Sequence, residues 1–162
     1  MTMPDKVAVL EAHAQNRAVA SLSTALPGAI LDAVFDRDEL TLTIAKDQIR
    51  AAASAVKQAG YRFLEDVTCV DWHPSEPRFH IIYHMLSMAF KERVRLVAQV
   101  ESMDPSIESI TSVWPAANFY EREVWDLFGV RFNGHPNLRR IMMPEEWEGH
   151  PLRKDYPVEG YR

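Results

Sequence analysis

The 162-residue sequence contains a single cysteine, Cys69, and this scarcity excludes two kinds of architecture. A disulfide within the chain needs a pair of thiols, and an iron–sulfur cluster held by the chain alone needs several ligands of this kind. Glycine is also sparse, with six residues, and the Gly-x-Gly-x-x-Gly pattern of a dinucleotide-binding turn is missing. The sequence therefore predicts a chain that carries neither an iron–sulfur cluster nor a nicotinamide nucleotide of its own.

Positive charge is in the minority, with 18 Lys and Arg against 23 Asp and Glu and a formal net charge of -5. Nucleic-acid binding requires a basic surface that neutralises phosphates, so nucleic acid is not an expected partner. No apolar run approaches the roughly 20 residues of a membrane span. The mixed N-terminal segment, with Asp5 and Lys6, is unlike a signal peptide. We expect a soluble chain that reaches a membrane only through partners.

The remaining composition, with 47% hydrophobic and 25% charged residues, is that of one globular domain. Hydrophobic periodicity predicts helices over residues 4–23, 48–58 and 115–128, and a short helix after Asp104-Pro105. Asp47 is the expected N-cap of the second helix, and Gly60 is the expected left-handed residue at its end. Alternating and β-branched segments predict strands over 29–35, 40–45, 63–72, 79–88 and 93–100.

The order of these elements favours an α+β fold. Three strands in the middle of the chain follow one another without crossover helices, which is typical of antiparallel pairing. The prediction is a mostly antiparallel sheet with helices packed on one face, occupying residues 1–134 as a platform domain.

From residue 135 onward the chain loses its periodicity, and we expect an extended docking tail over 135–162 with at most one helical turn near 144–147. Prolines recur along it, at Pro136, Pro144, Pro151 and Pro157. Prolines reduce the freedom of the unbound chain, so less entropy is lost when it lies along a partner. Aromatic residues, methionines and cations in the tail are the side chains that commonly anchor an interface.

Two residues of the helix 115–128 break its amphipathic pattern: Glu121 projects onto the edge of the apolar arc, and Phe119 projects among polar residues. A buried carboxylate needs a partner. Its candidate partners are the tail arginines Arg139, Arg140 and Arg153. The alternative is that Glu121 reaches water and Phe119 packs under the tail. An exposed pair between Arg122 and Asp126 would stabilise the helix by only ~0.3–0.5 kcal/mol.

The same helix and the tail carry a recognisable signature. It consists of Glu121-Arg122-Glu123-Val124-Trp125-Asp126-Leu127-Phe128, then His135, then Arg139-Arg140-Ile141-Met142. This pattern resembles the 30-kilodalton subunit family of respiratory complex I, NADH:quinone oxidoreductase. The continuation from Met143 to Tyr156 resembles the family's C-terminal tail, and the segments 63–72 and 79–83 are similar more loosely. The resemblance covers residues 60–157.

The resemblance implies a non-catalytic peripheral subunit of a proton-translocating complex, on the cytoplasmic face of a prokaryotic membrane. Iron–sulfur clusters, FMN, NADH and quinone would bind to partner subunits. The chain would scaffold the quinone-site subunit, of the 49-kilodalton type, next to iron–sulfur subunits. Many members continue beyond the position of Arg162, and the partner contacts of such an extension are not assumed for this chain. The implied docking residues are Glu121, Arg122, Glu123, Asp126, His135, Arg139, Arg140, Trp147, Arg153, Lys154, Asp155 and Tyr156.

Other functions remain open at this point. A related membrane-bound hydrogenase or formate hydrogenlyase uses a similar subunit, and a free-standing adaptor would share the composition. A metal site built on His80 and His84 is disfavoured, because on a strand these side chains lie roughly 13 Å apart. Cys69 lies in a β-rich segment, where a buried and unreactive thiol is the commoner state.

Overall fold

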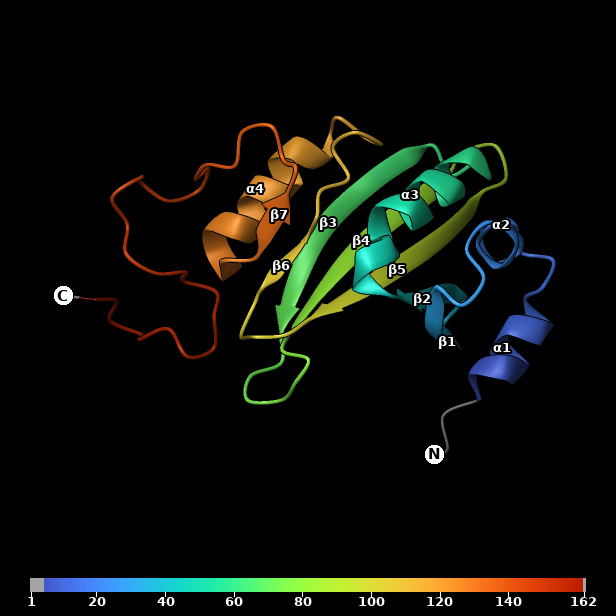
Figure 1. Ribbon diagram of the computed structural model, residues 1–162, viewed down its shortest axis with the longest axis horizontal. Coiled ribbons are helices and arrows are strands. Elements are labelled where there is room, and N and C mark those ends of the chain that lie inside the picture. The colour runs from blue at the N-terminus through green and yellow to red at the C-terminus, as the bar shows by residue number, and fades with distance from the viewer. Residues whose placement is uncertain (1–4, 162) are drawn as a thin grey trace.

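A five-stranded sheet with α3 and α4 against one face organises residues 5–161, which the computed structural model describes (Figure 1). The helical elements are α1 Lys6–Ala12, α2 Arg17–Ala25, the 3-10 turn η1 Lys46–Gln48, α3 Ile49–Gln58 and α4 Ala117–Phe128. The strands are β1 Ile30–Asp36, β2 Glu39–Ile44, β3 Phe63–Asp71, β4 Phe79–Ser87, β5 Glu92–Val100, β6 Ser106–Glu108 and β7 Arg131–Asn133. β6 and β7 form a separate small sheet.

The strand order of the main sheet is β1-β2-β5-β4-β3. Three of its pairs, β1 with β2, β3 with β4 and β4 with β5, are antiparallel. β2 and β5 are parallel, and α3, β3 and β4 lie between them in the sequence. Parallel neighbours need a long crossover of this kind, whereas antiparallel neighbours are joined by short turns. The expected α+β fold is confirmed, and its sheet is mixed.

Strand β4 shows how the sequence divides the two faces of the sheet. Phe79, Ile81, Tyr83 and Met85 are almost fully buried, while the residues between them are half-buried on the opposite face. The alternation arises because successive side chains of a strand point to opposite sides. Burying each large apolar side chain stabilises the fold by about 1.5–3 kcal/mol. The helices therefore cover one face, as predicted.

The expected single helix over 4–23 is wrong, because the chain breaks between α1 and α2. Asn16 ends the interruption: its Oδ1 accepts hydrogen bonds from the backbone N–H groups of Ala18, at 2.9 Å, and Val19, at 3.3 Å. Asparagine competes with helix continuation in this way and favours a new N-terminus. Pro4, the expected first residue, lies outside the described residues.

Two further local predictions are corrected. The segment after Asp104-Pro105 is not a helix: it forms β6, which pairs in parallel with β7. The two strands are distant in the sequence, so this pairing arises only when the chain has folded. Asp47 lies within η1 and does not cap α3, whose N-terminus has no side-chain cap from residues 5–161. Gly60 has a φ of +110°, as expected after the helix, and a Cβ there would lie 2.7 Å from the Phe90 ring.

Helix α4 ends at Gly129, which adopts a left-handed φ of +75°. The tail, here residues 135–161, forms turns and no helix or strand among its described residues. It extends from α4 on the side away from α3 (Figure 1). The tail is connected to the domain by side chains, and these connections define the candidate site.

Candidate docking surface

Asp126 of α4 is fully buried and binds the first half of the tail. Its Oδ2 accepts hydrogen bonds from the consecutive backbone N–H groups of Ile141, Met142 and Met143, at 2.9, 2.7 and 2.9 Å. Successive N–H groups that converge in this way form a pocket for an anion. Burial alone would raise the pKa of Asp126, but these donors and Arg140 together hold it below its usual range. The carboxylate therefore stays ionised and fixes the backbone of the tail.

Arg140 completes this first anchor. Its guanidinium lies 2.5 Å from Asp126 Oδ1 and donates hydrogen bonds to the carbonyl oxygens of Trp147, at 2.8 Å, and Gly149, at 2.9 Å. The planar fork of arginine suits several acceptors at fixed angles. One side chain thus joins α4 to both ends of the loop 140–149. Arg140 points into the protein and is not a free contact for a partner.

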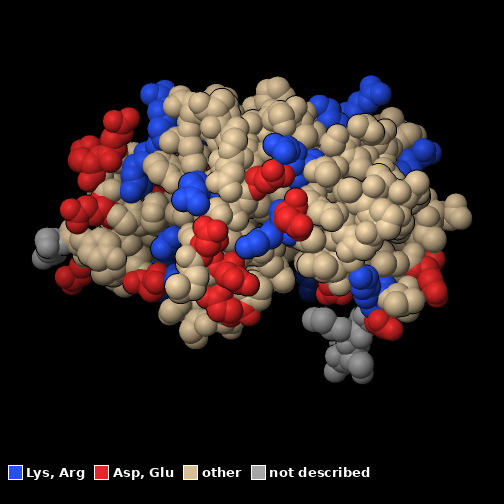
Figure 2. Space-filling view, in the orientation of Figure 1, with Lys and Arg blue, Asp and Glu red and all other residues tan. Residues whose placement is uncertain are grey.

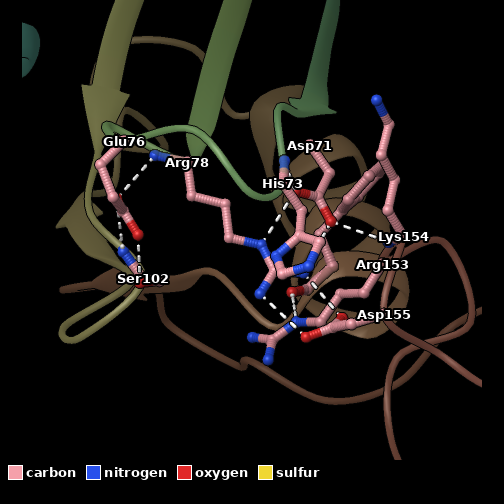
Figure 3. A network of polar contacts seen from close by, with 9 residues as sticks. Asp71, His73, Glu76, Arg78, Ser102, Arg153, Lys154 and Asp155 are labelled. Atoms are coloured by element: carbon pink, nitrogen blue, oxygen red, sulfur yellow. Dashed lines mark hydrogen bonds and ion pairs between the residues drawn. The ribbon is translucent and has the colours of Figure 1, made fainter.

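A second anchor holds the end of the tail to the turn between β3 and β4 (Figure 3). Arg78 donates two hydrogen bonds to Asp71, both at 2.8 Å, and two to Asp155, at 3.0 and 2.7 Å. Asp71 also accepts from the backbone N–H of Lys154 at 2.8 Å. Burial would raise the pKa of Asp71, but Arg78 and the N–H donors hold it far below its usual range. The ion pair of Arg78 with Asp71 is almost completely buried, with 8% and 2% of the side chains exposed.

Arg153 connects the two anchors. Its Nε donates to the carbonyl oxygen of Phe128 at 2.5 Å, and its guanidinium carbon lies 5.2 Å from the centre of the Phe79 ring. The last carbonyl groups of a helix have no partner within the helix, so this contact satisfies one of them. At Gly129, whose φ is +75°, a Cβ would lie 2.5 Å from both the Arg153 and the His150 side chains, so another residue would strain the backbone and displace these contacts between α4 and the tail.

Glu121 is fully buried, but its predicted arginine partners are wrong. Its carboxylate accepts from the Ser109 hydroxyl at 2.6 Å and from the Ile110 backbone N–H at 2.7 Å. Burial raises the pKa of Glu121 to about 7, and these two hydrogen bonds oppose the shift only in part. The hydroxyl of Tyr83, buried nearby without a hydrogen-bond partner among the described residues, has its pKa raised by burial and by Glu121. Glu121 thus connects α4 to the segment after β6 and does not reach the tail.

Arg122 and His135 join the start of the tail to α4. Arg122 donates to the carbonyl oxygens of Arg139, at 3.1 Å, and Arg140, at 3.0 Å. The His135 Nδ1 accepts from a backbone N–H, so its Nε2–H donates to the Asn118 carbonyl at 3.1 Å. The expected pair between Arg122 and Asp126 does not form, because Asp126 faces the tail.

The predicted docking residues therefore separate into two groups. The inward group holds the tail or the core: Glu121, Arg122, Asp126, His135, Arg140, Arg153 and Asp155. The outward group has exposed side chains: Glu123, Arg139, Trp147 and Lys154. Tyr156 is half-buried, with its ring edge-on to Tyr161 at 5.3 Å. We use the name tail surface for five exposed side chains, two of α4 and three of the tail: Phe119, Glu123, Arg139, Met142 and Trp147.

Sequence reasoning missed Asp71 and Arg78, which carry the second anchor. A weak signal was present, because Asp71 ends an apolar strand and Arg78 is the only cation in the turn before Phe79. Their partners Lys154 and Asp155 lie more than seventy residues away, at separations of 83 and 77 positions. Local patterns carry no information about pairs at that distance.

Comparison with known proteins decides the family. The family model for the "Respiratory-chain NADH dehydrogenase, 30 Kd subunit" matches residues 42–162. The chain belongs to this family. The C-type subunit of NADH-quinone oxidoreductase from Citrifermentans bemidjiense is 44% identical over 146 residues, covering 90% of this chain and 91% of the relative. The equivalent protein of Geobacter sulfurreducens is 46% identical over 147 residues, with the same coverages. The predicted identity as a subunit of NADH:quinone oxidoreductase is confirmed.

Solved structures agree with the fold of this 30-kilodalton family. A trypsin-resistant fragment (1-134) of Nqo5 superimposes with a TM-score of 0.67 at 28% identity, covering 75% of this chain and 99% of the fragment. A chain from an archaeal membrane-bound sulfane sulfur reductase shares the fold at 24% identity, with a TM-score of 0.75, covering 90% of this chain and 86% of that one. Within residues 5–161, no three His, Cys, Asp or Glu side chains are grouped to hold a metal ion. No helix in that range has the length and apolar character to cross a bilayer.

Proposed function

We propose that this family member is a non-catalytic scaffold of NADH:quinone oxidoreductase, and that α4 and the tail form one preformed docking element for the quinone-site subunit. The observation that carries the proposal is the double anchoring of the tail. Asp126 and Arg140 hold its first half to α4, and Asp71 and Arg78 hold its end to the sheet. These contacts leave the tail surface facing outward.

Preorganisation is the physical advantage of this arrangement. A flexible arm loses conformational entropy when it binds, and this loss lowers its affinity. Here the backbone N–H groups of residues 141–143 already have a partner within the chain. Phe119 and Met142 nevertheless remain 61% exposed, and Trp147 remains 39% exposed. Aromatic and methionine side chains on a rigid base are favourable anchors for an interface.

The remaining parts of the proposal concern the complex around this chain. Iron–sulfur clusters, FMN, NADH and quinone are bound by partner subunits, among them the quinone-site subunit of the 49-kilodalton type and its iron–sulfur neighbours. The chain contributes position and no reacting group. It sits on the cytoplasmic face of the membrane through these partners, as a platform of residues 1–134 followed by the tail.

The test uses the complex assembled in its host with an affinity tag on this chain. The variants are Arg139→Glu and the double variant Met142→Ser with Trp147→Ala, which change exposed side chains and keep the anchors. We expect at least a tenfold loss of co-purifying quinone-site subunit and an unchanged melting temperature of the isolated chain. Met103→Ser is the matched control, because Met103 is 93% exposed and lies outside the tail surface. Intact complex with lowered turnover alone would contradict a scaffolding role.

A further inference from the structure

A hollow of about 550 Å³ lies where β4 turns into β5, at the end of the main sheet away from the tail (Figure 1). Its lining includes Phe63, Leu86, Met88, Phe90, Gly60 and Arg62. Phe63 is 55% exposed, Met88 is 75% exposed and Phe90 is 40% exposed. Large apolar side chains that share an exposed concavity mark a binding surface more often than single exposed residues do.

The shape of this hollow is fixed by the packing of Phe90. One side of the ring lies so close to Gly60 that a Cβ at residue 60 would approach it to 2.7 Å. The guanidinium of Arg17 lies 3.7 Å from the ring centre, in a cation–π contact. Phe90 is therefore held between Arg17 of α2 and Gly60, the second residue after α3. The hollow is present before any partner binds.

Three cations lie at or next to the hollow, although the chain as a whole has a net charge of -5: Arg62 lines it, Arg17 contacts Phe90, and Lys91 follows Phe90 in the sequence. Arg17, Arg62 and Lys91 are exposed, and none of them forms an ion pair with another described residue. Glu92, the carboxylate of the same hairpin, accepts a hydrogen bond from the Tyr61 hydroxyl at 2.8 Å. Figure 2 shows separate Lys and Arg side chains along the upper right edge of the molecule, with uncharged surface between them.

We propose that the Phe63–Met88–Phe90 hollow is a second docking site, which takes a segment of a sister protein of the complex with a large apolar side chain flanked by carboxylates. The apolar side chain enters the hollow, and the carboxylates pair with Arg62 and Lys91. Apolar contact supplies the affinity, while the charges select and orient the partner. The proposal does not depend on the tail surface. It requires only that this chain belongs to a multisubunit complex.

The form of the site favours a protein segment over the two alternatives. A loop that inserts into a membrane projects its apolar side chains outward, whereas Phe63 and Phe90 here line a concavity. A second copy of the chain could offer its own acidic segment around Trp147. That segment lies on the tail, at the other end of the molecule, so such a contact would be head-to-tail and would build an open chain of subunits.

The test places a photo-crosslinking amino acid, p-benzoylphenylalanine, at Met88 in the assembled complex. We expect a crosslink to one sister protein, at a peptide with Asp or Glu next to the crosslinked residue. The double variant Arg62→Glu with Lys91→Glu should lower the crosslink yield at least tenfold, while Arg62→Lys with Lys91→Arg should preserve it. The melting temperatures of the isolated variants are the control for folding. They should be unchanged, because Met88, Arg62 and Lys91 are exposed.

Each other outcome overturns this second site. The possibilities are no protein crosslink, a crosslink to a second copy of the chain, a crosslink to a peptide without carboxylates, or a crosslink yield that is the same in the charge-reversal variant. Selective pelleting of the isolated chain with anionic phosphatidylglycerol vesicles would assign the surface to lipid instead. None of these results bears on the tail surface, because the residues changed here lie outside it.

Discussion

The carboxylate of Asp126 in α4 and the guanidinium of Arg140 in the tail lie 2.5 Å apart, and they are 0% and 11% exposed. The two residues are fourteen positions apart, with the end of α4, β7 and the start of the tail between them. Around this pair the tail closes into a loop whose N–H and carbonyl groups are bound by side chains. The tail is thus a folded part of the domain in this structure.

Removing the carboxylate should release the first half of the tail. Asp126→Ala leaves Arg140 buried without a counter-ion and leaves the N–H groups of residues 141–143 without an acceptor. Breaking a buried pair in this way costs about 3–5 kcal/mol. Urea unfolding measures the loss, and trypsin should cut earlier at Arg139 or Arg140. Glu123→Ala is the control on the exposed side of α4, with an expected change within about 0.5 kcal/mol.

Arg78 should not be replaceable by lysine. Its fork binds Asp71 and Asp155 at once, and a lysine ammonium cannot reproduce four hydrogen bonds in one plane. We expect Arg78→Lys to lower the free energy of unfolding by at least about 1.5 kcal/mol. Cleavage after Arg153 or Lys154 should speed up as well. By contrast, Arg37→Lys changes an exposed pair with Asp36, and stability should stay within about 0.5 kcal/mol.

Glu121 predicts a pH dependence of stability. Burial raises its pKa from an ordinary value of 4.5 to about 7, so the folded chain holds this proton more tightly than the unfolded chain. The stabilising contribution is complete below pH 4.5 and is lost as the pH rises through 7. With about 1.36 kcal/mol for each pKa unit, it amounts to about 3 kcal/mol. Unfolding free energies measured across this range should show it.

Glu121→Gln isolates this contribution, because glutamine keeps the shape and does not titrate. Burial lowers the pKa values of His135 and His150, so their contribution to the free energy of unfolding is lost as the pH falls. This pH dependence is opposite in sign to that of Glu121. Their effect is common to both proteins and cancels in the difference. The difference between wild type and variant should change steadily from pH 4.5 to 7. A difference that is flat with pH would show that Glu121 keeps an ordinary pKa in the folded chain.

Local chemistry was enough to predict much of the fold. The strands β3, β4 and β5 follow from alternation and β-branched residues, and α4 follows from its apolar arc. The break before α2 and the strand β6 escaped prediction for different reasons. Asn16 starts α2 through its own side chain, a local signal that periodicity alone does not register. β6 exists because β7 pairs with it, and that pairing is made only by the fold.

The site was predicted in composition but not in geometry. The signature residues gather at α4 and the tail, as the resemblance implied. Which of them point inward depends on pairs between distant segments, such as Asp71 with the backbone of Lys154. Glu121 illustrates the limit: its position on the helix left both burial and contact with water open, and its partners Ser109 and Ile110 come from a segment predicted to be helical.

Hydrogen–deuterium exchange on the isolated full chain tests most directly whether the tail is folded before it meets a partner. The amides of Ile141, Met142, Met143 and Lys154 donate to buried carboxylates, so they should exchange much more slowly than those of exposed loops. In Asp126→Ala the first three should lose this protection. If all four amides of the wild-type chain exchanged at the rate of an unstructured peptide, the tail would become ordered only on its partner, and a preformed docking surface would be ruled out.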